Sequence, residues 1–212
     1  MRKYLVEAVG TFFLALSMGL TTNPLAIGLL LAGLIYGGMH VSGAHFNPAI
    51  SFAYLLKKRI SFGTFSSYFV SQCLGVFAAG GLILFFSNEV FYVEPPASTD
   101  LYQQAGMELL LTFVLALTYL SVATDKVLAS NKAYGLAIGL VLSGLIMLGD
   151  SISGAVLNPA ISIGLSAIDF LAIRGASYEF IPLYLVSPIA GATLAALFHQ
   201  YINNDYSSVT SR

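Results

Sequence analysis

Long apolar stretches separated by short polar segments dominate the pattern of the chain. A helix rises 1.5 Å per residue, so about 20 apolar residues cross a bilayer core about 30 Å thick. Stretches of about this length lie at 4–22, 26–42, 62–86, 104–124, 134–150 and 179–201. The pattern therefore predicts an all-α membrane protein with six transmembrane helices.

Two helix-like stretches between these spans are only about half a membrane long. They are NPAISFAYLL at 47–56 and NPAISIGLSAI at 158–168. In each, the first residue is a good N-cap, and proline is tolerated at the first helical position. Ser-Gly-Ala precedes both, which favours irregular backbone. Each stretch therefore predicts a loop that enters the membrane and continues as a re-entrant half-helix.

The chain carries an internal repeat. SGAHFNPAIS at 42–51 returns as SGAVLNPAIS at 153–162, with eight of ten positions identical. Further matching segments are VEAVGTFFLAL (6–16) with GMELLLTFVLAL (106–117), and YFVSQCLG (68–75) with YLVSPIAG (184–191). Each half has three spans, so the second copy enters the membrane upside down. We expect a single transmembrane channel domain over 1–212, with inverted halves of approximately 1–100 and 101–212.

Composition agrees with a chain whose main solvent is lipid. Hydrophobic residues make up 57% of the sequence and charged residues 9%, whereas soluble domains carry roughly 25% charge. The net charge of −1 argues against nucleic acid as a partner. The single cysteine, Cys73, excludes an internal disulfide and a cysteine-based metal cluster. No cofactor or metal is expected.

Basic residues predict the orientation. One side of the six-span topology would carry Arg2, Lys3, Lys57, Lys58, Arg59, Lys126, Lys132 and Arg212, and the other side only Arg174. The positive-inside rule then places both termini in the cytoplasm. The connection 87–101 carries acidic residues and no base, which agrees with an outer position. We expect an integral protein of the plasma (inner) membrane.

The two half-helices suggest a chemical use. If they meet end to end near the midplane, Asn47 and Asn158 face each other. Each helix N-terminus presents unpaired N–H groups and a partial positive charge, which repels protons and other cations. The amides donate hydrogen bonds and the preceding loop carbonyls accept them. Such a passage suits a small neutral hydroxylic molecule in single file.

Two Asn-Pro-Ala motifs in inverted halves make the chain resemble the aquaporin family of major intrinsic proteins. The motifs are Asn47-Pro48-Ala49 and Asn158-Pro159-Ala160, and SPIAGATLAAL in the last span extends the similarity. The resemblance implies a passive transmembrane channel for water and/or small neutral solutes. It also implies a homotetramer surrounded by lipid, in which each subunit has its own pore.

The sequence departs from the family pattern at one position. The family usually has arginine directly after the second motif, and here the residue is Ile161. Carried over by their offsets from the motifs, the constriction residues are Ile27, Ile146, Ala155 and Ile161. None has a side-chain donor or acceptor. Two alternatives stay open: a channel that favours ammonia, carbon dioxide, hydrogen peroxide or small alcohols with poor water flux, and a non-conducting structural member.

Ionisable residues inside the spans are functional candidates by default. Glu7 and Glu108 occupy equivalent positions, which favours a role in bracing one re-entrant loop each over a role as proton relays. His40 and His45 flank the first Ser-Gly-Ala and are candidates for pore lining or gating. Asp150 is expected near the outer mouth as a loop-bracing carboxylate, with attraction of cations as the alternative.

An enzyme is not expected. The sequence shows no serine elbow, no paired catalytic carboxylates, no metal cluster and no phosphate-binding loop. No histidine has a partner at metal-ligand spacing.

Overall fold

The computed structural model describes residues 1–124 and 132–209, so Lys126 and Arg212 lie outside the described residues. The elements are α1 (Arg2–Leu20), α2 (Pro24–Ser42), α3 (Pro48–Leu56), α4 (Phe62–Ser87), α5 (Leu101–Thr124), α6 (Tyr134–Ser153), α7 (Pro159–Ile173), the 3-10 helix η1 (Ser177–Phe180) and α8 (Ile181–Val209). Within the described ranges there is no β-strand. The all-α prediction is confirmed.

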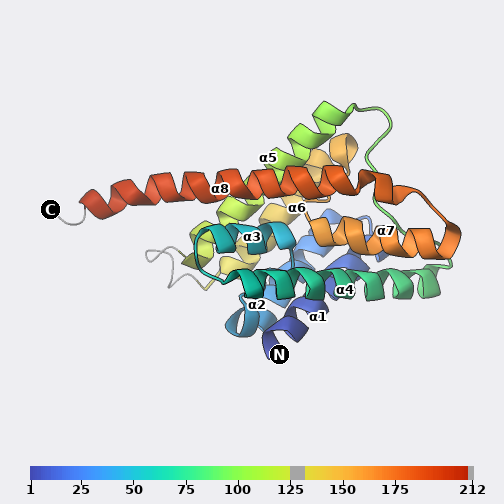
Figure 1. Cartoon of the computed structure of the whole chain (residues 1–212), viewed down its shortest axis with the longest axis horizontal. Helices are drawn as coiled ribbons and strands as arrows, with labels where there is room; N and C mark the ends of the chain where they lie inside the picture. The colour runs from blue at the N-terminus through green and yellow to red at the C-terminus, as the bar shows by residue number, and fades with distance from the viewer. Residues whose placement is uncertain (125–131, 210–212) are drawn as a thin grey trace.

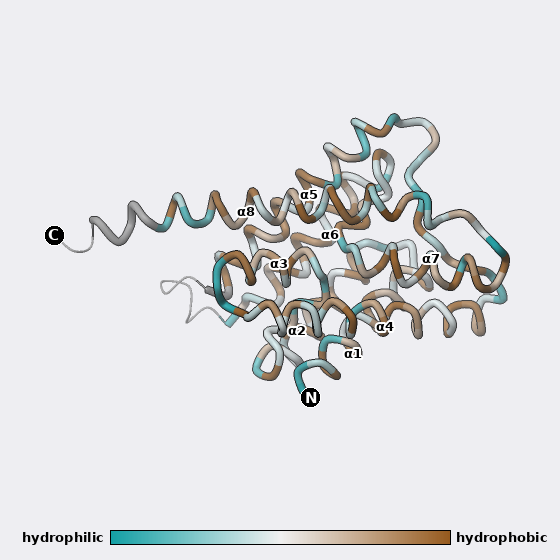
Figure 2. The backbone as a smooth tube through the Cα atoms, in the orientation of Figure 1, coloured by the Kyte–Doolittle hydropathy of each residue, from teal (hydrophilic) through white to brown (hydrophobic). Residues whose placement is uncertain are grey.

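Six helices are long and apolar enough to cross a membrane: α1, α2, α4, α5, α6 and α8. They correspond to the predicted spans within a few residues at most ends. Local caps explain several starts, because Asn23 accepts from the N–H groups of the first turn of α2 and Ser61 caps α4. Figure 2 shows hydrophobic residues along the long helices and hydrophilic ones in the connections.

The two shorter helices α3 and α7 lie between α4 and α8, and Figure 1 shows them following one another along one line. α3 has 9 residues, about 14 Å of helix, and begins directly after Asn47. α7 has 15 residues, about 22 Å, and begins directly after Asn158. The predicted end at residue 168 is wrong by about a turn. The buried Asp169 stays in the helix, where its carboxylate accepts from Ser177 N–H.

Equivalent helix pairs in the two halves pack through a glycine at the point of closest approach. α1 lies against α4, and α5 lies against α8. A Cβ on Gly75 would overlap the backbone carbonyl of Ala8, and a Cβ on Gly191 would overlap that of Leu109. Small residues at such contacts allow helices to approach closely where lipid supplies no hydrophobic driving force. The inverted repeat is thus present in the packing as well as in the sequence.

The two halves also interlock. α2 packs against α6, with Gly28 against Gly139, while α3 contacts α8 and α7 contacts α4. Each half-helix is therefore held partly by the other half. Gly33 and Gly37 differ from these glycines, since a Cβ on either would meet nothing within 4 Å among the described residues. Neither glycine therefore serves a close helix contact among the described residues of one chain.

Candidate functional site

The loops that precede α3 and α7 have the same unusual backbone. Gly43 and Gly154 have φ of 88° and 82°, in the left-handed region. The non-glycine residues Ala44, Phe46, Ala155 and Leu157 also have positive φ, between 44° and 54°. Such residues are uncommon with positive φ and persist only where the surroundings hold them. The side chains that hold these two loops in place are therefore central to the site.

The carboxylate of Glu7 holds the first loop. Its Oε1 accepts from Ser42 Oγ at 2.6 Å and from His45 N–H at 3.0 Å. Its Oε2 accepts from Phe46 N–H at 2.7 Å and from Gln72 Nε2 at 2.8 Å. The side chain is fully buried, so these bonds replace the water that loop N–H groups would otherwise need.

The carboxylate of Glu108 holds the second loop in the same way. It accepts from Ser153 Oγ at 2.8 Å and from the N–H groups of Val156 at 2.9 Å and Leu157 at 2.7 Å. Tyr184 adds a bond from its hydroxyl to the Ser153 carbonyl at 2.7 Å. Two glutamates at equivalent positions of the repeat thus fix the two loops in one shared conformation.

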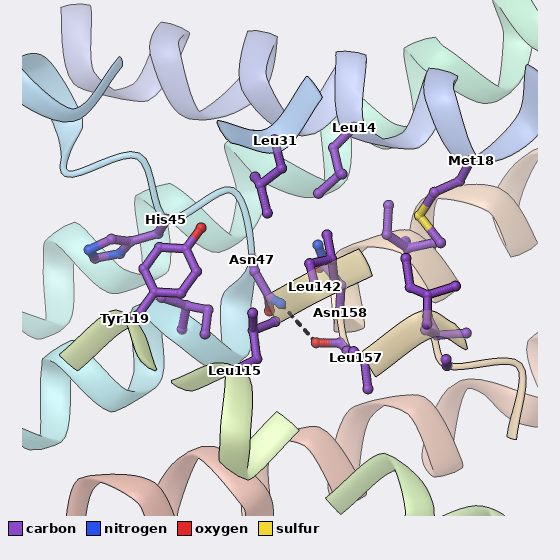
Figure 3. Close-up of a pocket in the computed structure, with 15 residues that line it drawn as sticks. Leu14, Met18, Leu31, His45, Asn47, Leu115, Tyr119, Leu142, Leu157 and Asn158 are labelled. Atoms are coloured by element: carbon purple, nitrogen blue, oxygen red, sulfur yellow. Dashed lines mark hydrogen bonds between the residues drawn. The ribbon is translucent and has the colours of Figure 1, made fainter. Parts of the chain in front are cut away.

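The two asparagines meet at the junction of α3 and α7 and bond across it. Asn47 Nδ2 donates to the Leu157 carbonyl at 2.8 Å, and Asn158 Nδ2 donates to the Phe46 carbonyl at 2.9 Å. Each side-chain oxygen accepts from the N–H two residues on, at 2.8 Å and 3.1 Å. Figure 3 shows both amides beside the same space. The asparagines are therefore fixed in place, with their oxygens already occupied.

This space is a narrow cavity of about 20 Å³, enough for about one water molecule. Its walls are Leu14, Met18, Leu31, His45, Asn47, Ile50, Leu115, Tyr119, Leu142, Ile146, Ala155, Val156, Leu157, Asn158 and Ile161. Most of these side chains are apolar, and the polar ones come mainly from the loops (Figure 3). The cavity can therefore accept a small molecule while offering it few, localised hydrogen bonds.

A wider vestibule of about 380 Å³ adjoins the cavity on the side of α7. The two spaces share Met18, Ile146, Ala155 and Val156 as wall residues. Of the expected constriction residues, Ile146 and Ala155 lie in both walls, Ile27 in the vestibule wall and Ile161 in the cavity wall. Ile146 and Ala155 thus lie where the cavity meets the vestibule, with Ile27 on the vestibule side and Ile161 on the cavity side. We call Ile27, Ile146, Ala155 and Ile161 the apolar neck.

The remaining candidates fall in different places. His45 is buried in the cavity wall, and its Nδ1 lies 3.0 Å from Ser51 Oγ. His40 is exposed in the last turn of α2 and is not among the residues that line the cavity. Asp150 is exposed and lines the vestibule together with Glu94. Among the described residues, no group of three histidines, cysteines or carboxylates is placed to hold a metal ion.

Several cavity residues were missed by the sequence analysis. They are Leu14, Met18, Leu31, Leu115, Tyr119 and Leu142, all on long helices. An apolar transmembrane helix gives little sign of which face lines a cavity. The aligned segments around Glu7 and Glu108 contained a usable signal, because Leu14 and Leu115 occupy equivalent positions in them.

Comparisons with known proteins agree with this geometry. The family model described as "Major intrinsic protein" matches residues 1–199. The chain is 34% identical to "Aquaporin NIP1-1" of Oryza sativa subsp. japonica, over 95% of this chain and 74% of that protein. It is 33% identical to "Nodulin-26" of Glycine max, over 95% of this chain and 78% of that protein.

An archaeal relative and a solved structure extend the comparison. "Aquaporin AqpM" of Methanothermobacter marburgensis is 30% identical, over 85% of this chain and 76% of that protein. The X-ray structure of the aquaglyceroporin from Plasmodium falciparum superimposes with a TM-score of 0.84 at 24% identity, covering 93% of this chain and 94% of that one. At this identity the structural match speaks for the fold.

Proposed function

The chain belongs to the major intrinsic protein family, and from that premise we propose that its solutes pass the paired asparagines and then the apolar neck. Membership and the six apolar helices make it an integral membrane channel for water or small neutral solutes. What we add is the role of the individual residues. The asparagines orient the permeant, and the neck reduces the flux of water relative to that of less polar solutes.

The observation that carries the proposal is the crossed bonding of Asn47 and Asn158. Each amide group has two N–H donors, and one of them is used on the opposite loop carbonyl. Each amide oxygen is used by its own helix. Toward a permeant in the cavity each amide keeps a second N–H donor, while its oxygen is held by its own half-helix. A molecule between the two asparagines can turn its oxygen or nitrogen to both donors, which supports passage of neutral acceptors.

Helix ends at the same point support the exclusion of cations. α3 and α7 both begin at the asparagine pair, so two helix N-termini direct partial positive charge at one place. Glu7 and Glu108 do not cancel this field by facing the cavity, because their oxygens are engaged with loop N–H groups. This engagement favours a bracing role for both glutamates over a proton relay.

The neck offers a passing solute no side-chain hydrogen bond. Ile161 and Ala155 are buried to 0% and 1% exposure, and Ile27 and Ile146 complete the junction. A polar solute that leaves water without replacement bonds loses about 1–3 kcal/mol per unmade bond. An apolar constriction can also exclude water altogether. The neck therefore favours solutes that lose fewer hydrogen bonds than water does, such as carbon dioxide, ammonia or small alcohols.

The test is solute flux in proteoliposomes by stopped-flow measurement with water, glycerol, hydrogen peroxide and ammonia. We expect the Ile161→Arg variant to raise water flux at least about fivefold, since one restored hydrogen bond has roughly that effect on a rate. Ile173→Arg is the matched control, because Ile173 lies on the same helix but is 59% exposed. Equal, high water flux in wild type and Ile161→Arg would disprove the neck. If no solute passes, the protein is a non-conducting, structural member of the family and the proposed channel function is wrong.

The orientation follows from charge. Arg2, Lys3, Lys57 and Arg59 lie at the ends of helices on the side that the α3 loop enters, which supports cytoplasmic termini in a plasma membrane. A reporter active only in the cytoplasm, fused after residue 212, should be active. An inactive fusion of a folded, membrane-inserted protein would reverse the assignment.

We also expect four copies to assemble, each with its own pore. Large apolar side chains such as Leu5, Phe85, Leu148 and Val186 are more than half exposed in one chain and need lipid or other subunits to cover them. The open faces of Gly33 and Gly37 leave room for close approach by a neighbour. Native mass measurement in detergent should give four times the 22.5 kDa mass of one chain. A monomer as the dominant species would contradict this.

A further inference from the structure

Most of the cavity wall is built from pairs of equivalent residues of the two halves. The equivalent pairs that are identical are Leu14 with Leu115, Leu31 with Leu142, Asn47 with Asn158, and Ile50 with Ile161. The pairs that differ are Met18 with Tyr119 and His45 with Val156. Within these pairs only two positions differ, and both differences add polarity to one side. Ile146, Ala155 and Leu157 line the wall without their equivalents from the first half.

Both polar exceptions lie on the same side of the asparagine pair. Because the halves are inverted, Tyr119 and His45 are on the side of α3, and Met18 and Val156 are on the side of α7. Figure 3 shows Tyr119 and His45 together on one side of Asn47 and Met18 on the other. The cavity therefore has the apolar neck at one end and an aromatic, polar group at the other.

Tyr119 connects two walls of the cavity. Its ring is carried by α5, next to Leu115, and is 1% exposed. Its hydroxyl lies 3.4 Å from the carbonyl oxygen of Ala44, in the loop that also supplies His45 and Asn47. The Tyr119 side chain therefore spans the cavity from α5 to the loop before α3, and a solute that moves along the cavity meets it.

Tyr119 belongs to a group of three neighbouring rings with Tyr54 and His45. The hydroxyl of Tyr54 donates to the Tyr119 backbone carbonyl at 3.4 Å. The Tyr54 ring lies 4.2 Å from the His45 ring, centre to centre. Both of these hydroxyl bonds are long at 3.4 Å and therefore weak, so a solute in the cavity can replace the bond from Tyr119 to Ala44 at small cost.

We propose that Tyr119 is a selectivity residue of the channel and forms a second barrier, on the α3 side of the asparagine pair. To pass, a solute must separate the Tyr119 hydroxyl from the Ala44 carbonyl. A small solute with an O–H or N–H group does this most easily, because it accepts from the phenol and donates to the carbonyl. This inference rests on the proposed function, in that solutes pass the asparagine pair, but it does not depend on the neck.

The test uses proteoliposomes of the full chain with Tyr119→Phe, which removes only the hydroxyl, and Tyr119→Met, which copies the equivalent residue Met18. Each variant is made in the wild-type and the Ile161→Arg background, so that the neck does not mask the second barrier. Tyr201→Met, at a 69% exposed tyrosine of α8, is the matched control. Chromatographic behaviour and thermal unfolding of Tyr119→Phe should match those of its parent.

In the Ile161→Arg background, we expect Tyr119→Phe to raise water flux about fivefold, the effect of one hydrogen bond on a rate. Tyr119→Met should do the same and should also raise glycerol flux relative to water, because the ring no longer fills the path. Tyr201→Met should change neither. Unchanged water and glycerol flux for both Tyr119 variants in both backgrounds would overturn the proposal.

Failure of the proposed function has a different signature. If Tyr119→Met raises flux in the wild-type background while Ile161→Arg does not, the barrier lies at Tyr119 and the neck is wrong. If Ile161→Arg raises flux and the Tyr119 variants add nothing, the neck stands and Tyr119 is only a wall residue. No flux in any variant would count against both proposals.

Discussion

The two loop–helix units, residues 42–56 and 153–173, share a scaffold but differ in the polar groups around it. In the first unit, Ser51 Oγ lies 3.0 Å from His45 Nδ1 and accepts from Gln72 Nε2 at 3.2 Å. In the second, the equivalent serine, Ser162, is buried, and its Oγ has no hydrogen-bond partner among the described residues. Val156 and Pro188 stand where the first unit has His45 and Gln72.

This difference separates what builds the loop from what sets its chemistry. The parts common to both units are the glutamate, the left-handed loop residues, the asparagine cap and a tyrosine bonded to the serine carbonyl. They are enough to fix the loop backbone, because the second loop has the same conformation without a counterpart of the His45 and Gln72 bonds among the described residues. The His45 and Gln72 network is therefore an addition to a complete scaffold, and it makes only one side of the cavity polar.

The largest effect is expected from removing the glutamates. Glu7→Ala and Glu108→Ala each leave at least two buried loop N–H groups unpaired, at about 1–3 kcal/mol per group. Glu7 also accepts from Gln72, so Glu7→Ala should lower the free energy of unfolding more than Glu108→Ala. Thermal unfolding in detergent measures this, with the exposed Glu179→Ala as control. Equal stability of Glu7→Ala and wild type would mean that the loop does not depend on the carboxylate.

The next effect tests whether the scaffold is equally tight in both halves. Gly75→Ala and Gly191→Ala place a Cβ against the carbonyls of Ala8 and Leu109, and should each lower the free energy of unfolding by about 1–3 kcal/mol. Gly33→Ala is the control, because a Cβ at Gly33 meets nothing within 4 Å among the described residues. It should not lower the free energy of unfolding of a single chain. A large difference between Gly75→Ala and Gly191→Ala would show that the halves are not equivalent in packing.

The smallest effect addresses the two serines directly. Ser51→Ala removes a bonded hydroxyl and should lower the free energy of unfolding by about 1 kcal/mol. Ser162→Ala removes a hydroxyl without a partner among the described residues and should leave stability unchanged or raise it slightly. Unfolding of the two variants in parallel measures the contrast. Equal loss at both sites would indicate that Ser162 is also bonded, for example through water.

Much of the architecture could be predicted because it depends on patterns within the sequence. Span length gave the long helices, and the repeated decapeptide gave both re-entrant helices and their inversion. The extension of α7 was missed because Asp169 interrupts the apolar run at which the predicted helix ended. Only the folded chain brings Ser177 within 3.0 Å of its carboxylate.

The cavity wall could be predicted only in part. Asparagines and glutamates in apolar surroundings stand out, whereas Leu31 or Leu142 looks like any lipid-facing leucine. Tyr119 carries no signal either, since aromatic residues are common along the spans and its significance comes from the 3.4 Å approach to Ala44. Contacts between segments far apart in the sequence decide such roles.

The reciprocal bonds of Asn47 and Asn158 have a consequence for biogenesis. Each asparagine borrows its acceptor from the opposite loop, Leu157 in one case and Phe46 in the other. A nascent chain that has been synthesised only as far as α4 therefore lacks the Leu157 carbonyl that holds the Asn47 amide. The paired asparagines therefore reach their final arrangement only after both halves of the chain have been inserted.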